Sequence, residues 1–211
     1  MITPLVSVYI VTCNRSDLLK RCLSSIQQQT YQELDIIVVD DASTDETKSF
    51  MEGVIKKDKR ITYYRNEENK GACYSRNIAI LNAKGKYITG SDDDDYFLNT
   101  RVESFVDRCD LLKKYSFMYS SNLFLNNNNL KKSLPNKFSK RTVGYNEIID
   151  YNSVGNQIFI ETKLLRKYLF DVEFPAWQDF ECWYRILFYE GGRAFNILDY
   201  SYIQDVQHDK G

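Results

Sequence analysis

The sequence lacks the marks of several large classes of protein. No stretch of its 211 residues approaches the roughly 20 consecutive apolar residues that a membrane-spanning helix needs. The first residues contain no basic region followed by a long apolar segment, so we expect no signal peptide. The formal net charge of -1 shows no excess of basic residues, which argues against nucleic acid as a partner. The sequence therefore predicts a soluble protein of the cytoplasm.

Cysteine and histidine are too scattered to suggest a metal site of their own. The 5 cysteines form no CxxC pair and follow no metal-binding spacing, which is typical of reduced thiols inside the cell. Cys22 and Cys109 fall at the apolar positions of predicted helices, so we expect both in the core. His208 is the only histidine, and a lone histidine near the end of a chain is more often exposed than a ligand.

Two common nucleotide-binding motifs are also missing. No GxGxxG follows the first predicted strand, and no GxxxxGK[ST] occurs in the chain. The segment after that strand, 12–15, contains no glycine that would let the backbone approach a pyrophosphate closely. The sequence therefore predicts neither a dinucleotide-binding domain nor a P-loop.

Strands and helices alternate regularly through the first half of the chain. Apolar runs predict strands at 5–12, 34–39, 61–65 and 87–89. Segments with helical periodicity follow the first three strands and end near residues 26, 55 and 81. We expect Asn14 to cap the first helix and Ser43 or Thr44 to cap the second. This alternation predicts an α/β domain with parallel, right-handed βαβ units in a Rossmann-like half.

The second half of the chain has a weaker pattern. It predicts a helix at 100–114, a strand at 117–125, a polar loop at 126–141, a strand at 157–160, helices at 163–168 and 178–189, and one or two strands within 194–204. A chain of this length forms one domain, or one domain with a small lobe.

An acidic run, Asp92 to Asp95, follows the fourth predicted strand directly. Adjacent carboxylates repel one another and can be buried only beside a cation. In open α/β sheets ligands bind beyond the carboxyl ends of the strands, and hard oxygen ligands suit Mg²⁺ or Mn²⁺ together with phosphates. The run therefore indicates a metal-dependent site for a phosphorylated substrate, and the alternative is a solvated loop.

Other predicted elements also present polar groups where they begin or end. Thr12 and Asn14 follow the first strand, and Asp40 and Asp41 follow the second. An aspartate after the second strand is well placed to accept hydrogen bonds from a nucleoside, although the same residues could instead cap the next helix. Asp179 lies in the first turn of a late helix, where an acid is common and mildly stabilising.

Four segments, taken in order, resemble the family 2 glycosyltransferases of the GT-A fold. They are residues 6–15, 37–45, 69–77, and 85–88 with the acidic run that follows. The resemblance covers about residues 4–100 closely and the remainder loosely. It implies a single GT-A catalytic domain over 1–211, with a mixed, mainly parallel sheet flanked by helices. About residues 1–98 would form the nucleotide-sugar-binding half, and about residues 99–211 the acceptor-binding half.

The resemblance implies roles for single residues of the donor half. Thr12 and Asp40 would contact the nucleotide base, with Asp41 nearby, and Arg76 would lie close to the base or the diphosphate. The whole donor-binding set that it implies is Thr12, Asn14, Arg15, Asp40, Asp41, Arg76, Asp92 and Asp93.

The family's Asp-x-Asp metal motif falls on the acidic run. Asp94 would be the principal ligand of Mn²⁺ or Mg²⁺, with Asp92 as a second ligand, although four acids in series leave the register open by one residue. Residues 90–91 are glycine and serine where the family commonly has bulkier apolar residues. Members of the family often carry a histidine after the last strands, so His208 is a further candidate ligand.

The segment 177–181 resembles the family's Glu-Asp motif at the start of a late helix. Asp179 matches the aspartate that serves as catalytic base, whereas Gln178 replaces the first acid of the motif. The resemblance therefore implies that Asp179 accepts the proton of an acceptor hydroxyl. The replacement by Gln178 removes a neighbouring charge and leaves the base in place.

The implied activity is inverting transfer of a sugar from a nucleoside-diphosphate sugar, most simply a UDP-sugar, to a hydroxyl group. By analogy the acceptor is a saccharide or a lipid-linked saccharide in the synthesis of a bacterial surface polysaccharide. The enzyme would then work in the cytoplasm, with peripheral association at the inner face of the membrane. Two alternatives stay open. A nucleotidyltransferase would use similar acids and metal, and a catalytically silent nucleotide-sugar-binding module is suggested by the short chain and by Gln178.

Overall fold

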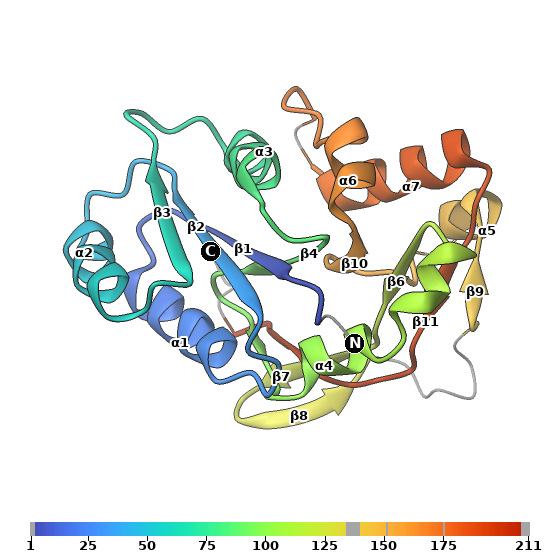
Figure 1. The fold of residues 1–211 in the computed structure, drawn as a ribbon, viewed down its shortest axis with the longest axis horizontal. Helices are drawn as coiled ribbons and strands as arrows, with labels where there is room; N and C mark the ends of the chain where they lie inside the picture. The colour runs from blue at the N-terminus through green and yellow to red at the C-terminus, as the bar shows by residue number, and fades with distance from the viewer. Residues whose placement is uncertain (1–2, 134–139, 151, 175, 208–211) are drawn as a thin grey trace.

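The computed structural model describes residues 3–133, 140–150, 152–174 and 176–207. The strands of its main sheet are β1 (Val6–Thr12), β2 (Leu34–Asp40), β3 (Ile61–Arg65), β4 (Tyr87–Asp92), β6 (Phe117–Tyr119), β9 (Thr142–Val143), β10 (Ile158–Glu161) and β11 (Ala194–Asn196). Their order across the sheet is β3-β2-β1-β4-β10-β6-β11-β9 (Figure 1). The sheet is mixed, because β10 and β9 run antiparallel to their neighbours.

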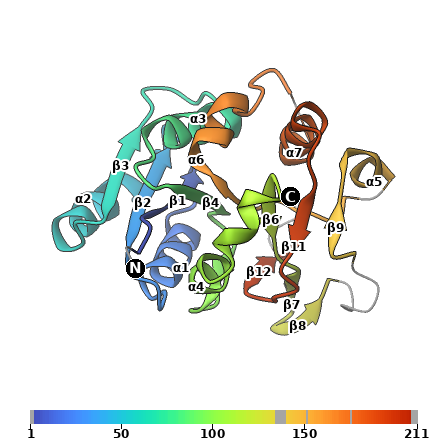
Figure 2. The same ribbon diagram turned by 45° about the vertical axis from the view of Figure 1, so that its right-hand side comes forward.

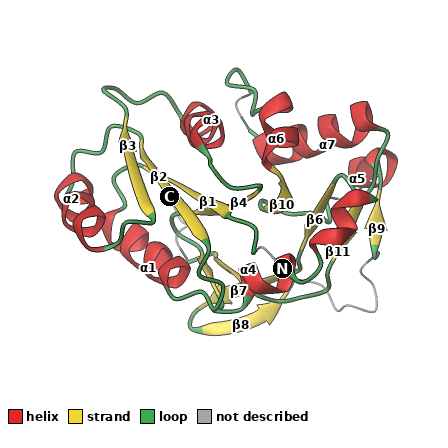
Figure 3. Ribbon diagram, in the orientation of Figure 1, coloured by secondary structure: helices red, strands yellow, loops and turns green. Residues whose placement is uncertain are grey.

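Helices cover both faces of this sheet. They are α1 (Ser16–Gln27), α2 (Thr47–Lys57), α3 (Ala72–Asn82), α4 (Arg101–Val106), α5 (Tyr145–Asp150), α6 (Thr162–Tyr168) and α7 (Gln178–Glu190). One buried cluster joins α1, α2 and α4 to the sheet, and a second cluster joins α3, α5, α6 and α7 to the opposite face. Figure 3 shows the two groups of helices on either side of the strands.

The central strands are buried on both faces. In β1, Val8 and Ile10 pack with α1, whereas Tyr9 between them packs in the cluster of α3 and α7. All three side chains are almost fully buried. A strand covered on both sides needs apolar residues at successive positions, which is why an unbroken apolar run predicts it correctly.

The parallel register brings the carboxyl ends of three strands to one edge. Thr12 pairs with Asp40 across β1 and β2, and Val11 pairs with Asp92 across β1 and β4. The predicted βαβ arrangement is thus confirmed, and β4 continues three residues beyond the predicted end at residue 89. Because β10 is antiparallel to β4, its first residues lie at this same edge.

A smaller sheet packs below β6 and β11 (Figure 2). Its strands are β5 (Tyr96–Phe97), β7 (Asn122–Asn126), β8 (Asn129–Lys132) and β12 (Tyr202–Asp205), in the order β5-β12-β7-β8. The turn between β7 and β8 places Asn127 and Asn128 at φ 48 and 61, which is the left-handed pair that a tight hairpin requires. The prediction of a loop from residue 126 is therefore wrong for the part that forms β8.

Two further predictions in the second half need correction. The single strand predicted at 117–125 is divided at Ser120 and Ser121, where the chain leaves the main sheet and enters the small one. The helix predicted at 100–114 is α4 followed by a 3-10 helix at Cys109–Lys113, since Leu111 N bonds Arg108 O in the tighter pattern. Cys22 is fully buried as predicted, whereas Cys109 is only half-buried.

Both predicted helix caps are wrong. The side-chain oxygen of Asn14 accepts a hydrogen bond from Thr44 N at 2.7 Å, so Asn14 ties two loops together instead of capping α1. Helix α2 begins at Thr47, beyond Ser43 and Thr44, and Asp45 Oδ1 accepts from Thr47 N at 3.0 Å. The two loops fix each other at the edge where the carboxyl ends of the strands meet.

Candidate active site

An open cleft of about 420 Å³ lies at the carboxyl ends of β1 and β4. The start of α3 forms one wall, and the end of β12 forms another. Of the predicted donor-binding residues, the wall contains Thr12, Arg15, Asp41, Arg76, Asp92 and Asp93. The chain therefore gathers in one place residues that are far apart in sequence.

The acidic run is not a solvated loop. Asp92 is the last residue of β4, and Asp93 and Asp95 are only 5% and 2% exposed. Burial of adjacent carboxylates is unfavourable unless cations or hydrogen-bond donors surround them. The groups that contact each carboxylate therefore show how its burial is compensated.

Thr12 and Arg15 hold Asp93 and Asp94. Thr12 Oγ1 donates to Asp93 Oδ2 at 2.7 Å, and Arg15 Nη1 lies 3.2 Å from Asp93 Oδ1 and 2.8 Å from Asp94 Oδ2. Burial raises the pKa of Asp93 to about 6, and the contacts with Thr12 and Arg15 limit the rise. The Arg15 side chain is 49% exposed, so it can leave these carboxylates without disturbing the core.

Asp95 is held by the small sheet. Tyr202 OH donates to Asp95 Oδ2 at 2.6 Å, and Asp205 N donates to Asp95 Oδ1 at 2.9 Å. Burial and the nearby charge of Asp92 raise the pKa of Asp95 to about 8. The hydrogen bonds from Tyr202 and Asp205 limit this rise.

Three side chains donate hydrogen bonds to the carboxylate of Asp92. Arg76 Nη2 lies 3.3 Å from Asp92 Oδ1, and Gln157 Nε2 lies 3.3 Å from the same oxygen. Asn156 Nδ2 donates to Asp92 Oδ2 at 2.6 Å. Asn156 and Gln157 immediately precede β10, and no sequence motif marked them as site residues.

Asp40 and Asp41 have different surroundings although they are adjacent. Asp41 lies in the cleft wall, and its Oδ2 accepts from Gly71 N at 2.8 Å at the start of α3. Asp40 is fully buried behind the wall, where Tyr63 OH donates to Asp40 Oδ2 at 2.6 Å and Arg65 Nε lies 3.3 Å from it. Asp40 therefore supports the cleft from behind its lining, whereas Asn14 is exposed and lies outside that lining.

Asp179 lies in the first turn of α7, near enough to Asp92 to feel its charge, although it is not among the residues that line the cleft. Arg76 Nη1 donates to Gln178 Oε1 at 2.9 Å, which connects α7 to the acidic run. Burial raises the pKa of Asp179, and the charge of Asp92 raises it further. A half-buried carboxyl group with a raised pKa beside a cleft has the properties of a general base.

The packing around position 90 explains why a glycine stands shortly before the acidic run. A Cβ at this position would collide with the ring of Tyr9 and with Gln157 Oε1. The Tyr9 ring therefore occupies the space that a bulkier residue at position 90 would fill. This departure from the family pattern is compensated within the neighbouring strand β1.

The donor chemistry of the run suits a divalent ion. In the described part of the chain no group of three or more His, Cys, Asp or Glu side chains is arranged to hold a metal. Asp92 and Asp94 nevertheless offer the hard oxygens that Mg²⁺ and Mn²⁺ prefer. Arg15 forms an ion pair with Asp94 and so balances its charge. His208 lies outside the described residues.

The sequence matches the description "Glycosyl transferase family 2" over residues 7–169, which is more than half of the chain. The chain therefore belongs to glycosyltransferase family 2. This membership decides against a nucleotidyltransferase.

Two relatives from Escherichia coli match most of this chain. WcaA of Escherichia coli K12, a glycosyl transferase provisionally assigned to colanic acid biosynthesis, is 33% identical over 97% of this chain and 74% of its own length. WfgD of Escherichia coli, named as a UDP-Glc:alpha-D-GlcNAc-diphosphoundecaprenol beta-1,3-glucosyltransferase, is 30% identical over 87% of this chain and 70% of its own length.

Solved structures of GT-A glycosyltransferases share the fold. TarS of Staphylococcus aureus superposes with a TM-score of 0.79 at 23% identity, over 96% of this chain and 37% of the TarS chain. The mannosyltransferase PcManGT from Pyrobaculum calidifontis, solved with GDP-Man and Mn²⁺, gives a TM-score of 0.72 at 20% identity, over 100% of this chain and 59% of its own. These similarities confirm the predicted GT-A fold. None of the described helices is both long and apolar enough to cross a membrane.

Proposed function

We propose that this protein transfers a sugar, with inversion at the anomeric carbon, from a nucleoside-diphosphate sugar to a hydroxyl group of a saccharide or lipid-linked saccharide. The observation that carries the proposal is the cleft in which Arg76 connects Asp92 to the first turn of α7, next to Asp179. This arrangement provides a place for a diphosphate and a base beside it.

A UDP-sugar is the proposed donor. WfgD is named as a user of UDP-Glc, and TarS has been solved with UDP-GlcNAc. In this chain Thr12 and Asp41 lie in the wall at the ends of β1 and β2, where the base would bind beyond the carboxyl ends of the strands. GDP, the nucleotide of the GDP-Man bound in PcManGT, is the second candidate.

Asp92 and Asp94 would hold Mn²⁺ or Mg²⁺ together with the diphosphate oxygens. When bound, such an ion supplies a Lewis acid that offsets the charge of the departing diphosphate. Arg76 would add a charge-assisted contact to the diphosphate, because a guanidinium binds phosphate oxygens well. The ion pair between Arg15 and Asp94 would break when the metal ion and the diphosphate bind.

Asp179 would act as the general base. It must be ionised to accept the acceptor proton, and its raised pKa brings it closer to the working pH, where proton transfer is most efficient. The hydrogen bond between Arg76 and Gln178 would orient the first turn of α7 and hence Asp179. No covalent intermediate is required.

The proposed acceptor is a lipid-linked saccharide in bacterial surface polysaccharide synthesis. WfgD and the Campylobacter jejuni relative, a GalNAc(5)-diNAcBac-PP-undecaprenol beta-1,3-glucosyltransferase, are named for acceptors of this kind. An acceptor held in the membrane would bring the enzyme to the inner face of that membrane as a peripheral protein.

Calorimetric titration with UDP, with and without Mn²⁺, tests the proposal. We expect Mn²⁺-dependent binding that Asp94→Ala weakens strongly and that Asp110→Ala leaves unchanged. Asp110 is a suitable control because its exposed side chain pairs with Lys113 and does not line the cleft. Absence of binding by UDP, GDP and other nucleoside diphosphates would overturn the proposal. Binding without sugar transfer from UDP-glucose or UDP-GlcNAc to lipid-linked acceptors would favour the silent module.

A further inference from the structure

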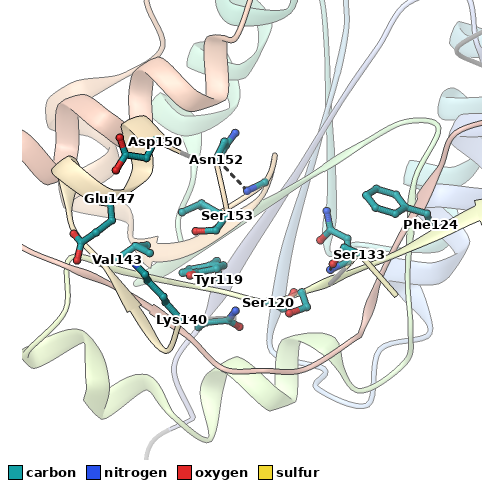
Figure 4. A pocket seen from close by; sticks show the side chains of 15 residues that line it. Tyr119, Ser120, Phe124, Ser133, Lys140, Val143, Glu147, Asp150, Asn152 and Ser153 are labelled. Carbon is teal, nitrogen blue, oxygen red and sulfur yellow. Dashed lines mark hydrogen bonds between the residues drawn. The ribbon is translucent and has the colours of Figure 1, made fainter. Parts of the chain in front are cut away.

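A second pocket, of about 270 Å³, lies beside the cleft. Its walls come from the ends of β6 and β11, the start of β7, helix α5 and the segment 152–155 (Figure 4). Because β10 is antiparallel to both β4 and β6, the ends of β4 and β6 point the same way. The pocket and the cleft therefore share one edge of the main sheet.

The lining of this pocket is mainly neutral and polar. Hydroxyl and amide side chains include Ser120, Ser121, Asn122, Asn152, Ser153 and Asn196. The ring of Phe124 adds an apolar surface at one end, as Figure 4 shows. Such a mixture of small donors, acceptors and apolar surface is suited to a hydroxylated ring of neutral charge.

The charged residues of the pocket do not favour an anion. Its described lining contains Lys140 together with two acids, Glu147 and Asp150. Arg193 pairs with Glu147 at 2.8 Å, so the pair adds no net charge. A phosphate would need a surplus of cationic donors, and the nucleotide cleft offers Arg15 and Arg76 for that purpose.

Two buried hydroxyl groups in the wall form no hydrogen bond of normal geometry in the described part of the chain. They are Tyr119 OH and Ser153 Oγ, although Ser153 and Asn196 lie close enough to the Tyr119 hydroxyl to limit the rise in its pKa that burial causes. The Tyr119 residue is fully buried, and Ser153 lies above its ring in Figure 4. Buried polar groups usually form hydrogen bonds, so these two hydroxyl groups are available to a hydroxylated ligand in the pocket.

The pocket is joined to the cleft by side chains that belong to both. Asn122 of the pocket donates to Oε1 of Gln204, which lines the cleft, at 3.2 Å. Gly155 lines the pocket, and the next residue, Asn156, donates to Asp92 at 2.6 Å. A ligand in the pocket would therefore be separated from the acidic run by a single layer of side chains.

We propose that this pocket binds a neutral hexose unit of the acceptor saccharide. The inference rests on the proposed glycosyl transfer, because it assigns the pocket to the substrate that receives the sugar. The pocket would hold one pyranose ring in place through the serine and asparagine side chains. It would thereby fix the acceptor relative to Asp179.

Valine methyl groups allow the two sites to be observed separately by NMR. Val143 and Val154 line the pocket, and Val11 lines the cleft. Methyl glycosides of glucose, galactose, N-acetylglucosamine and N-acetylgalactosamine are titrated into the whole chain in the presence of UDP and Mn²⁺. We expect at least one glycoside to shift the Val143 and Val154 signals saturably, and UDP to shift Val11.

Two variants link the shifts to the pocket. Ser121→Phe should fill the pocket and abolish the glycoside shifts, whereas Ser49→Phe, at an exposed position of α2, should preserve them. Ser153→Ala removes a hydroxyl that forms no hydrogen bond of normal geometry in the described part of the chain, so it should weaken glycoside binding about two- to tenfold and change thermal stability little.

The outcomes separate the two proposals. If UDP shifts Val11 but no glycoside shifts Val143 or Val154 up to its solubility limit, the pocket assignment is wrong and the proposed function stands. If inorganic phosphate shifts these two valines instead, the neutral ligand is wrong. If UDP fails to shift Val11 while a glycoside shifts the pocket valines, the glycosyl-transfer proposal fails and the pocket remains a saccharide site.

Discussion

The guanidinium of Arg76 lies between the acidic run and helix α7, 3.3 Å from Asp92 Oδ1. Its other terminal nitrogen donates to Gln178 Oε1 at 2.9 Å, and the group stacks over the ring of Phe170 at 5.2 Å. One cation thus couples the carboxyl end of β4 to the first turn of the helix that carries Asp179. Gln178 stands where the family commonly has an acid, so Arg76 meets a neutral amide there and pairs with Asp92. The charge of Arg76 also limits the rise in the pKa of Asp179 that burial causes.

Replacement of Arg76 by methionine should damage both stability and nucleotide binding. Asp92 would lose its cation and keep only neutral donors, which should lower the free energy of unfolding by about 1–3 kcal/mol. UDP affinity should also fall, since the diphosphate would lose a charge-assisted contact. Urea denaturation and calorimetry measure the two effects. Arg108→Met, at an exposed site, serves as control, and equal UDP affinity in both variants would contradict the proposed role.

Asp179→Asn should abolish transfer while leaving UDP binding intact. Removal of a general base typically lowers the rate about 10²- to 10⁴-fold. In the wild type, transfer should decline as the pH falls through the raised pKa of Asp179, because the protonated carboxyl group cannot accept a proton. A pH profile of kcat/KM with its acidic limb at the ordinary aspartate pKa would show that a different group limits the rate.

The same variant should be more stable than the wild type at neutral pH. Folded Asp179 has a pKa raised above the ordinary 3.8, so the folded protein holds a proton that the unfolded chain has released. Stability of the wild type therefore falls as the pH rises from 3.8 through the raised pKa. The difference between the two proteins, measured by urea denaturation, should be smallest near pH 4 and grow toward pH 8. A constant difference would exclude this explanation.

The first half of the fold could be predicted because its elements are encoded locally. The strand over 5–12 needs apolar residues on both faces, and the helix that follows needs a periodic apolar face. Thr12, Asp41 and the acidic run follow strand ends directly, so a parallel sheet places them together without further information. Chain order and strand direction were enough to locate this part of the site.

The second half could not be predicted because its pairings are distant in sequence. Tyr202 and Asp95 are 107 positions apart, and their hydrogen bond depends on β12 joining the small sheet. Asn156 and Gln157 reach Asp92 only because β10 runs antiparallel beside β4. Neutral amides at a strand start carry no local signal of such a contact. The division of the predicted strand at Ser120 likewise depends on the second sheet.

Arg15 should compete with a divalent ion for the carboxylates. It pairs with Asp93 and Asp94, and because its own side chain is half-exposed, solvent screens the interaction to about 0–1 kcal/mol. Arg15→Ala should therefore tighten Mn²⁺ binding in the absence of nucleotide by up to about fivefold. Electron paramagnetic resonance titration of free Mn²⁺ measures this change. Lys20→Ala, which removes a surface pair with Asp17, should have no effect, and weaker Mn²⁺ binding by Arg15→Ala would contradict the competition.

Gly90→Ala tests the packing beneath the acidic run. The new Cβ would collide with the Tyr9 ring and Gln157, and overpacking of this kind lowers the free energy of unfolding by about 1–3 kcal/mol. Gly53→Ala is the control, since a Cβ at Gly53 meets nothing within 4 Å and alanine favours the helix by about 0.5–1 kcal/mol.

The two glycine substitutions should therefore change stability in opposite directions in urea denaturation. Combining Gly90→Ala with Tyr9→Leu should give a smaller loss than the sum of the single losses, because the leucine leaves room for the added methyl group. Gly90→Ala should also weaken UDP binding with Mn²⁺, since Gln157 donates to Asp92. Additive losses in the double variant would show that the Tyr9 ring does not set the requirement for glycine at position 90.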